Sequence, residues 1–154
     1  MGTRAIVGIS NKYHQNIKCI MVSYDGGFDN VGKILYQHYN NYEMAKQIVE
    51  LGNLTSIAPN FGNIAKSCWE HINMPFDKQG IVSHMRDCSG WNDYPTDCSY
   101  ETNKPRHYAN FKELKNDYDS VKYFYIHDTI QWRTASYETN FRFVPLVRAI
   151  KILI

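Results

Sequence analysis

The sequence lacks the features that mark membrane spans and secretion leaders. Its longest apolar run lies at the C-terminus and is interrupted by Arg148 and Lys151, whereas a helix that crosses a bilayer needs ~20 apolar residues. The first residues lead straight into a strand-like run, without the charged and apolar regions of a signal peptide. We therefore expect a cytoplasmic protein with no membrane partner.

Net charge and cysteine pairs are also scarce. The 154 residues carry a formal net charge of only +2, and Lys and Arg are scattered, unlike the clustered basic face of a dedicated nucleic-acid binder. Cys19, Cys68, Cys88 and Cys98 form no C-x-x-C pair, so we predict no metal and no cofactor. A metal site that uses Cys88, Cys98 and a nearby histidine is the alternative to ordinary free thiols.

Motifs for catalysis are missing as well. The sequence has no G-x-S-x-G and no H-E-x-x-H. His127-Asp128-Thr129 is one H-x-T element, but two-histidine phosphoesterases need two, because an acid and a base act on opposite sides of the phosphate. A hairpin turn explains Asp128 without catalysis. We predict that the protein is not an enzyme, with a signal-degrading enzyme as the alternative.

Aromatic residues, by contrast, are abundant. Twelve Tyr, three Trp and seven Phe make up 14% of the chain. Tyrosine joins a flat apolar body to a polar tip, which suits wet interfaces and ligand pockets. An AT-rich genome, whose codons favour Tyr, Asn, Lys and Ile, explains the same composition without function.

Length and patterning predict one α+β domain, residues 1–154, in which an antiparallel sheet has two or three helices packed on one face. Apolar alternation and β-branched residues predict two hairpins, 3–10 with 17–24 and 120–126 with 129–136, and a further strand at 80–86. The strand at 17–24 is apolar on both faces, which indicates a central position. Helical spacing predicts helices at 31–39 and at 42–51, the latter ended by Gly52, and a short helix that starts at Asn110.

The remaining segments are less regular. We expect Leu54, Ile57 and Phe61 to pack as a loop over the core, residues 64–72 to form a short helix, and 87–106 to form a long polar loop. The apolar tail, 145–154, predicts a last helix or an edge strand. Because an exposed tail would present a large apolar surface, we expect a homodimer or larger homo-oligomer, unless the tail docks on its own core.

Several motifs together resemble a family of small phage and prophage proteins. The first block comprises Thr3-Arg4, Tyr24-Asp25-Gly26, the segment VGKILYQHY at 31–39 and the segment LGNLTSI at 51–57. A second block, GIVSHMRDCSGW at 80–91, and the aromatic pattern of 123–132 extend the resemblance over nearly the whole chain. The sequence departs from the family pattern at Tyr24, which replaces Trp, at Met85, which separates His84 from Arg86, and in a longer insertion after Trp91.

This resemblance implies a phage protein that acts in the cytoplasm of an infected bacterial host. Small phage proteins of this type are often anti-defence factors, and some sequester cyclic nucleotide signals without cleaving them. The expected partner is therefore a cyclic nucleotide or a related phosphorylated signal. The alternative is a phage protein that inhibits a host defence protein, such as a CRISPR effector, by direct binding through a Tyr-rich surface.

A candidate ligand site follows from the same residues. Gly26 and Gly27 stand before a helix N-terminus, where backbone N–H groups can face phosphate, although Asp25 and Asp29 oppose an anion and a plain strand-to-helix turn explains the loop equally. Arginine offers a forked donor set to phosphate, and an aromatic ring offers a base its face. The predicted ligand-binding residues are Arg4, Tyr24, Asp25, Gly26, Gly27, His84, Arg86 and Trp91. By its helical spacing, His38 is expected to be a core histidine.

Overall fold

The computed structural model describes residues 3–59, 63–65, 79–83 and 103–152. No helix in these ranges has both the length and the apolar composition to span a bilayer. His84, Arg86 and Trp91, and most of the predicted loop at 87–106, lie outside the described residues. The prediction of a single domain over 1–154 also extends beyond them and stays a prediction.

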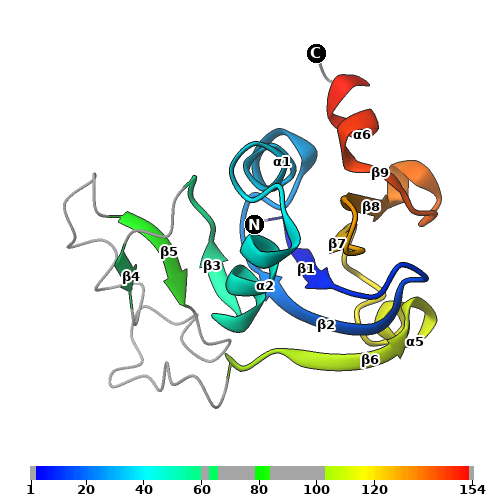
Figure 1. Cartoon of the computed structure of the whole chain (residues 1–154), viewed down its shortest axis with the longest axis horizontal. Helices are drawn as coiled ribbons and strands as arrows, with labels where there is room; N and C mark the ends of the chain where they lie inside the picture. Colours follow the sequence, from blue (N-terminus) through cyan, green and yellow to red (C-terminus); the bar gives the residue numbers. More distant parts are fainter. Residues whose placement is uncertain (1–2, 60–62, 66–78, 84–102, 153–154) are drawn as a thin grey trace.

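The fold is α+β with a mostly antiparallel sheet, as predicted (Figure 1). Within the described ranges nine strands form the sheet in the order β4-β5-β3-β2-β1-β7-β8-β9, and β6 pairs with β2 beside this path. The strands are β1 (Ala5–Ile9), β2 (Gln15–Val22), β3 (Leu54–Ser56), β4 (Asn63–Ala65), β5 (Gln79–Ser83), β6 (Arg106–Asn110), β7 (Tyr123–His127), β8 (Trp132–Ser136) and β9 (Val144–Pro145). The helices are the π-helical turn η1 (Phe28–Gly32), α1 (Lys33–His38), α2 (Tyr42–Glu50), α5 (Phe111–Asp117), the short η4 (Tyr137–Thr139) and α6 (Leu146–Ile152).

Both predicted hairpins are confirmed, and a parallel pairing joins them. β1 pairs with β2 and β7 pairs with β8 in antiparallel fashion, while β1 runs parallel to β7, with Ala5 opposite Tyr123 and Ile9 opposite His127. Parallel neighbours begin at the same edge of a sheet. We call the edge with Arg4, the loop 23–27 and residues 120–122 the amino edge. The opposite edge, with residues 10–15 and 127–131, is the carboxyl edge.

The neighbouring strands β1 and β7 are buried on both faces of the sheet. Alternation along β1 directs Ala5, Val7 and Ile9 to one face and Ile6 to the other. Helices α1, α2 and α6 cover the first face, and α5 covers the second (Figure 1). The prediction of helices on one face therefore holds for the helices at 31–39 and 42–51, and α5 adds a second layer. Burying one large apolar side chain contributes about 1.5–3 kcal/mol, so both layers stabilise the sheet.

Local signals fix the helix ends. The side chain of Asn41 accepts a hydrogen bond from the Met44 N–H at the start of α2, and Asn110 accepts one from the Glu113 N–H at the start of α5. Gly52 follows α2 with a φ of 87°, the left-handed conformation that glycine adopts without strain.

His38 is not a core histidine, because it is exposed at the end of α1. The buried position belongs to Tyr39, which leaves the helix with a φ of −134°. Its hydroxyl donates to the Ala58 carbonyl at 2.7 Å, and its own carbonyl accepts from the Trp132 indole at 2.7 Å. Because the chain leaves the helix at Tyr39, the buried position predicted for residue 38 falls on residue 39.

The segment after α2 contains strands where a loop was expected. β3 lies beside β2, with Leu54 opposite Val22, because the central strand β2 leaves an edge that needs a partner. Leu54 and Ile57 are buried as predicted, but Ile64 belongs to β4, so the predicted helix at 64–72 is wrong at its start. Its residues 66–72 lie outside the described ranges. At the far end of the predicted long loop, Arg106 already belongs to β6.

The C-terminal tail docks on its own core. It forms β9 and α6, and Leu146, Ala149 and Ile150 are buried in the core on the first face of the sheet, which we call the first core. The expected exposure of this tail is wrong, so the reason for a homo-oligomer is lost. The homo-oligomer itself stays a prediction.

Candidate functional site

The amino edge unites the described part of the predicted ligand site. The Gly26 N–H donates to the Thr3 carbonyl at 2.8 Å, so the loop after β2 lies against the start of β1. Arg4 is exposed, and its Nη2 donates to the Ser120 hydroxyl at 2.6 Å. Tyr24 is 44% exposed on the same loop. One guanidinium nitrogen is thus bound within the protein, while the arginine as a whole is exposed.

A buried tyrosine of β7 is hydrogen-bonded to the backbone of this loop. The Tyr125 hydroxyl donates to the Gly26 carbonyl at 2.6 Å. Asp25 adopts a φ of 57°, and a Cβ on Gly26 would lie 2.8 Å from the Ala5 Cβ and 2.9 Å from the Thr3 carbonyl. The loop is therefore closely packed on the start of β1, so a ligand would have little of it to order.

A wide helical turn follows the loop. The Gly32 N–H donates to the Gly27 carbonyl at 3.1 Å, in a π-helical pattern that precedes α1. No side chain caps this helix start, and Asp29 lies in its first turn. Such π-helical turns are frequent at functional sites. The carboxylate of Asp29, however, opposes an anion at this point.

Tyrosines adjoin the loop from β7 and η4. Tyr123 packs edge-on against Phe28 at 5.1 Å and against Tyr137 at 5.7 Å between ring centroids. A Cβ on Gly27 would lie 3.9 Å from the Tyr123 hydroxyl. Tyr137 is 48% exposed, and the Lys122 ammonium lies 5.5 Å from its ring centroid. We call Arg4, Tyr24, Lys122, Tyr123 and Tyr137 the amino-edge surface.

The amino edge also carries acids. Asp25, Asp29 and Glu138 are exposed there beside the two cations Arg4 and Lys122. Burial is the main cause that raises the pKa of Tyr123, and the nearby Tyr137, Glu138 and Asp29 raise it further. The phenol therefore stays neutral. Among the described residues of this edge, the three acids outnumber the two cations, so they give it no excess of positive charge. A ligand with many negative charges would be repelled.

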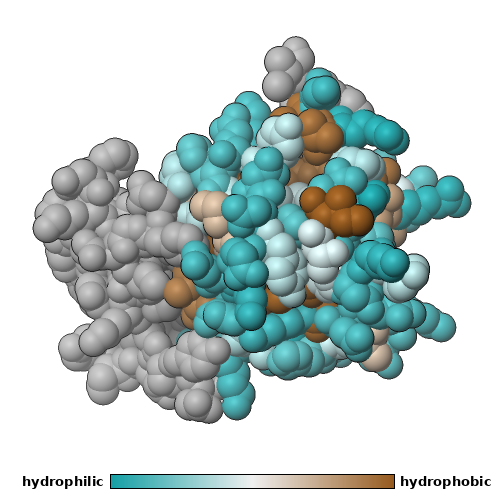
Figure 2. Space-filling model, in the orientation of Figure 1, coloured by the Kyte–Doolittle hydropathy of each residue, from teal (hydrophilic) through white to brown (hydrophobic). Residues whose placement is uncertain are grey.

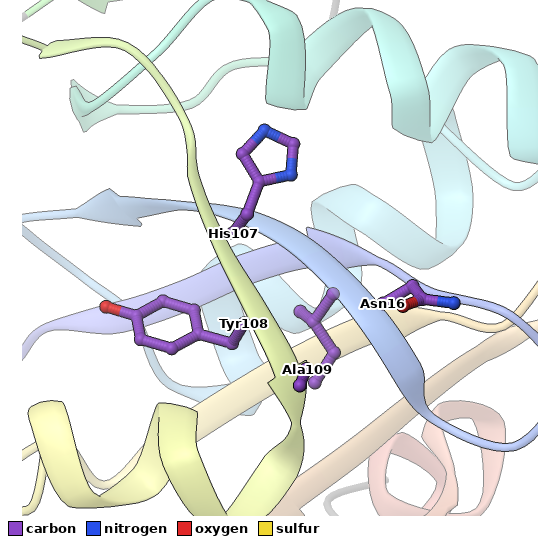
Figure 3. Close-up of a pocket in the computed structure, with 5 residues that line it drawn as sticks. Asn16, His107, Tyr108 and Ala109 are labelled. Atoms are coloured by element: carbon purple, nitrogen blue, oxygen red, sulfur yellow. The ribbon is translucent and has the colours of Figure 1, made fainter.

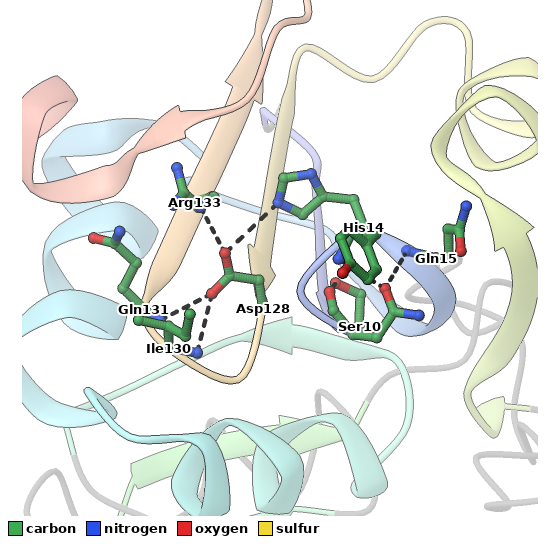
Figure 4. Close-up of polar contacts among 9 residues, drawn as sticks. Ser10, His14, Gln15, Asp128, Ile130, Gln131 and Arg133 are labelled. Atoms are coloured by element: carbon green, nitrogen blue, oxygen red, sulfur yellow. Dashed lines mark hydrogen bonds and ion pairs between the residues drawn. The ribbon is translucent and has the colours of Figure 1, made fainter.

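The carboxyl edge holds a polar cluster around Asp128 (Figure 4). This carboxylate is only 2% exposed. It accepts hydrogen bonds from the N–H groups of Ile130 and Gln131 and, at 2.6 Å, from Nε of Arg133, while Nε2 of His14 lies 3.8 Å away. Burial acts to raise the pKa of Asp128, but these hydrogen bonds outweigh it and hold the pKa below its usual range.

Two histidines near this cluster are packed against aromatic rings. His14 stacks on Phe143 with 4.2 Å between centroids, and His127 is 1% exposed, edge-on to Trp132 at 5.3 Å. Burial lowers the pKa of both, although Asp128 partly offsets it. The backbone of Asn40 also raises the pKa of His127, but no hydrogen bond of regular geometry reaches either ring nitrogen within the described residues. His127 thus fits a core position, and Asp128 a turn.

These histidines predict that the protein loses stability in mild acid. Their pKa values in the folded chain lie below the ordinary value of 6.5, so below that pH the unfolded chain binds more protons. The two neutral histidines therefore do not reduce the free energy of unfolding above pH 6.5, and this free energy falls as the pH drops below 6.5. Thermal unfolding at about pH 7.5 and about pH 5.5 measures the loss, and His127→Phe, which removes one buried histidine, should make it smaller. An equal loss in the variant contradicts the role of His127.

A shallow pocket beside β6 does not form a convergent site. It has a volume of about 240 Å³ and is lined by Asn16, Ile17, His107, Tyr108 and Ala109, below the ~300–1,000 Å³ of ordinary ligand clefts. The rings of His107 and Tyr108 extend to different sides of β6 (Figure 3), and the Tyr108 hydroxyl is bound to Asp117 at 2.7 Å. In the described part of the chain, no group of three or more His, Cys, Asp or Glu residues could hold a metal ion.

The structure thus brings Arg4 and residues 24–27 together, while His84, Arg86 and Trp91 stay outside the described residues. Ser83 is the last described residue of β5 and pairs with Leu54 of β3. Leu54 in turn pairs with Val22 of β2. The residue before His84 therefore lies two strands away from β2. Comparison of the chain with protein-family models, with curated protein sequences and with solved structures finds no match.

Proposed function

We propose that the protein binds a cyclic nucleotide signal at the amino-edge surface and sequesters it intact, as a phage-encoded inhibitor of immunity in the cytoplasm of an infected bacterium. The observation that carries the proposal is the exposed Arg4 beside a rigid glycine loop, with Tyr24 and Tyr137 partly exposed on the same edge. The phage-family resemblance supplies the biological setting.

The charges of the edge favour a phosphodiester over a nucleoside triphosphate. Asp25, Asp29 and Glu138 offset Arg4 and Lys122, and like charges across a contact weaken binding. A cyclic dinucleotide has a single negative charge on each phosphate, whereas ATP concentrates several on one chain. The guanidinium fork of Arg4 matches one such phosphate.

The tyrosines supply a surface for the bases. Stacking of a base on an aromatic side chain is worth about 1–3 kcal/mol. Tyr24 lies on the loop beside Arg4, and Tyr137 adjoins the loop through Tyr123. Two bases of one ligand would therefore have two separate rings. The predicted His84, Arg86 and Trp91 would add to this set.

Replacement of Arg4 by alanine is expected to weaken binding at least tenfold, which corresponds to ~1.4 kcal/mol. The reason is that a phosphate loses a charge-assisted donor, while an exposed arginine contributes little to folding. Isothermal titration with a panel of cyclic dinucleotides, and with ATP for comparison, measures the change. Arg148→Ala removes another exposed arginine, on α6, and should leave the affinity unchanged.

The fate of the ligand separates sequestration from degradation. After incubation with a cyclic dinucleotide that binds, the protein is denatured by heat and the released nucleotide is analysed by mass spectrometry. Intact ligand is expected. A hydrolysed product would make the protein an enzyme, and no binding by any member of the panel would contradict the proposal.

A further inference from the structure

Among the side chains whose burial the structure describes, the two most exposed large hydrophobic ones lie on the carboxyl edge. Tyr13 is 67% exposed in the loop between β1 and β2, and Ile130 is 71% exposed in the turn between β7 and β8. Both are far from the amino-edge surface, at the opposite ends of strands β1 and β7. The face seen in Figure 2 is mostly hydrophilic with isolated apolar patches. Folding does not require the exposure of Tyr13 and Ile130.

The same device presents each of these side chains. The Asn11 side-chain oxygen accepts from the N–H groups of Tyr13 at 2.9 Å and Gln15 at 3.0 Å. The Asp128 carboxylate accepts from Ile130 at 3.1 Å and Gln131 at 3.0 Å. In each turn the exposed hydrophobic residue thus follows an Asn or Asp by two positions, and that side chain holds the backbone. We call residues 11–15 and 128–131 the two hairpin tips.

The two tips are joined into one surface. The Ser10 N–H donates to the His127 carbonyl at 3.0 Å where β1 and β7 end. Beyond this bond, Nε2 of His14 on the first tip lies 3.8 Å from the Asp128 carboxylate on the second. Figure 4 shows His14 and Arg133 on either side of that carboxylate. Tyr13 and Ile130 therefore stand on rigid, neighbouring turns, so binding through them costs little conformational entropy.

Two exposed cations, Lys12 and Arg142, lie beside these tips. The Lys12 ammonium lies 5.1 Å from the Tyr13 ring centroid and is exposed. Arg133 is partly exposed beside Asp128, and exposed Arg142 precedes the Phe143 that stacks on His14. Asp128 is buried and already neutralised by Arg133. The Arg133–Asp128 pair therefore has no net charge, and Lys12 and Arg142 supply the positive charge that faces solvent beside the tips.

We propose that the two hairpin tips form a docking surface for a protein partner whose own surface is acidic and has an apolar recess. Tyr13 and Ile130 enter the recess, and Lys12 and Arg142 face its acidic rim. Tyr and Arg are enriched among the residues that dominate binding energy in protein interfaces. This surface is separate from the amino-edge surface, so it does not depend on the nucleotide proposal.

The test measures which chemistry the tips select. A library of random linear peptides displayed on phage is selected against the whole immobilised protein, and enriched sequences are synthesised and titrated by fluorescence anisotropy. Peptides that combine Asp or Glu with aromatic or aliphatic residues are expected. Tyr13→Ser and Ile130→Ser should each weaken their binding at least tenfold, and Lys12→Glu should weaken it most at low salt.

Controls make every outcome decisive. Tyr24→Ser removes a partly exposed tyrosine from the amino edge and should leave peptide binding unchanged, and thermal unfolding of each tip variant should match the parent because the altered side chains are exposed. Enrichment without acidic residues, or binding that survives both tip substitutions, overturns the proposal. A single-stranded RNA oligonucleotide of random sequence that binds more tightly than the peptides and is lost with Lys12→Glu also overturns it, in favour of a nucleic acid.

Discussion

Replacing Trp132 with alanine is expected to lower the free energy of unfolding by about 3–5 kcal/mol. The indole is 2% exposed in the core between β8 and the helices, and its N–H donates to the Tyr39 carbonyl at 2.7 Å. The substitution leaves a cavity in the first core and removes the hydrogen bond that ties β8 to the end of α1. Urea unfolding followed by far-UV circular dichroism measures the change.

Two matched variants divide this effect. Trp132→Phe keeps an aromatic ring but leaves the Tyr39 carbonyl without the indole donor, which costs about 1–3 kcal/mol. Tyr137→Ala removes a partly exposed aromatic residue and should stay within ~0.5 kcal/mol of the parent. If Trp132→Ala and Tyr137→Ala had equal effects, Trp132 would not occupy the core that the structure gives it.

Gly26→Ala is expected to destabilise the protein by about 1–3 kcal/mol through overpacking alone, and to displace the loop of the amino edge. The new Cβ would meet backbone atoms of residues 3 and 4 at 2.9 Å, which cannot move aside as a flexible side chain would. Retreat of the loop would also break the hydrogen bond from the Tyr125 hydroxyl to the Gly26 carbonyl. Thermal unfolding measures the loss of stability.

Gly27→Ala is the control for this prediction. A Cβ at Gly27 would lie 3.1 Å from the Asp29 side chain and at an ordinary contact distance of 3.9 Å from the Tyr123 ring, and Gly27 has an ordinary extended conformation with a φ of −72°. Its melting temperature should therefore stay close to that of the parent. A loss of stability as large as that of Gly26→Ala would contradict the tight packing of residue 26 against β1.

The sequence predicted those parts of the fold that depend on neighbouring residues. The two hairpins follow from strand patterns flanked by polar turns, and the helix that starts at Asn110 and the stop at Gly52 follow from capping chemistry. Strands β3 and β4 were not predicted, because three residues are too few to show the alternation of a strand. His38 was misassigned because helical spacing cannot reveal that Tyr39 leaves the helix.

Non-local pairing limits the prediction of the candidate site in the same way. Arg4 and the loop 24–27 were identified from motifs, and the antiparallel hairpin brings them together. Tyr123, Tyr125 and Tyr137 were missed, because they reach the loop only through the parallel pairing of β1 with β7. At the other edge, the turn at Asp128 was recognised from its local chemistry, but its contact with His14 depends on the same pairing.

The parallel pairing of β1 with β7 also sets the order in which the protein can fold during synthesis. β1 has its partner β2 at once, but β7 is more than a hundred residues further along the chain. Until β7 leaves the ribosome, the first hairpin exposes apolar side chains, such as Ile6, on both of its faces. The edge of β1 that later pairs with β7 is also free. Pairings over such long separations fold slowly and are prone to aggregation. We therefore expect the nascent chain to depend on chaperones, and fragments that end before β7 to be insoluble.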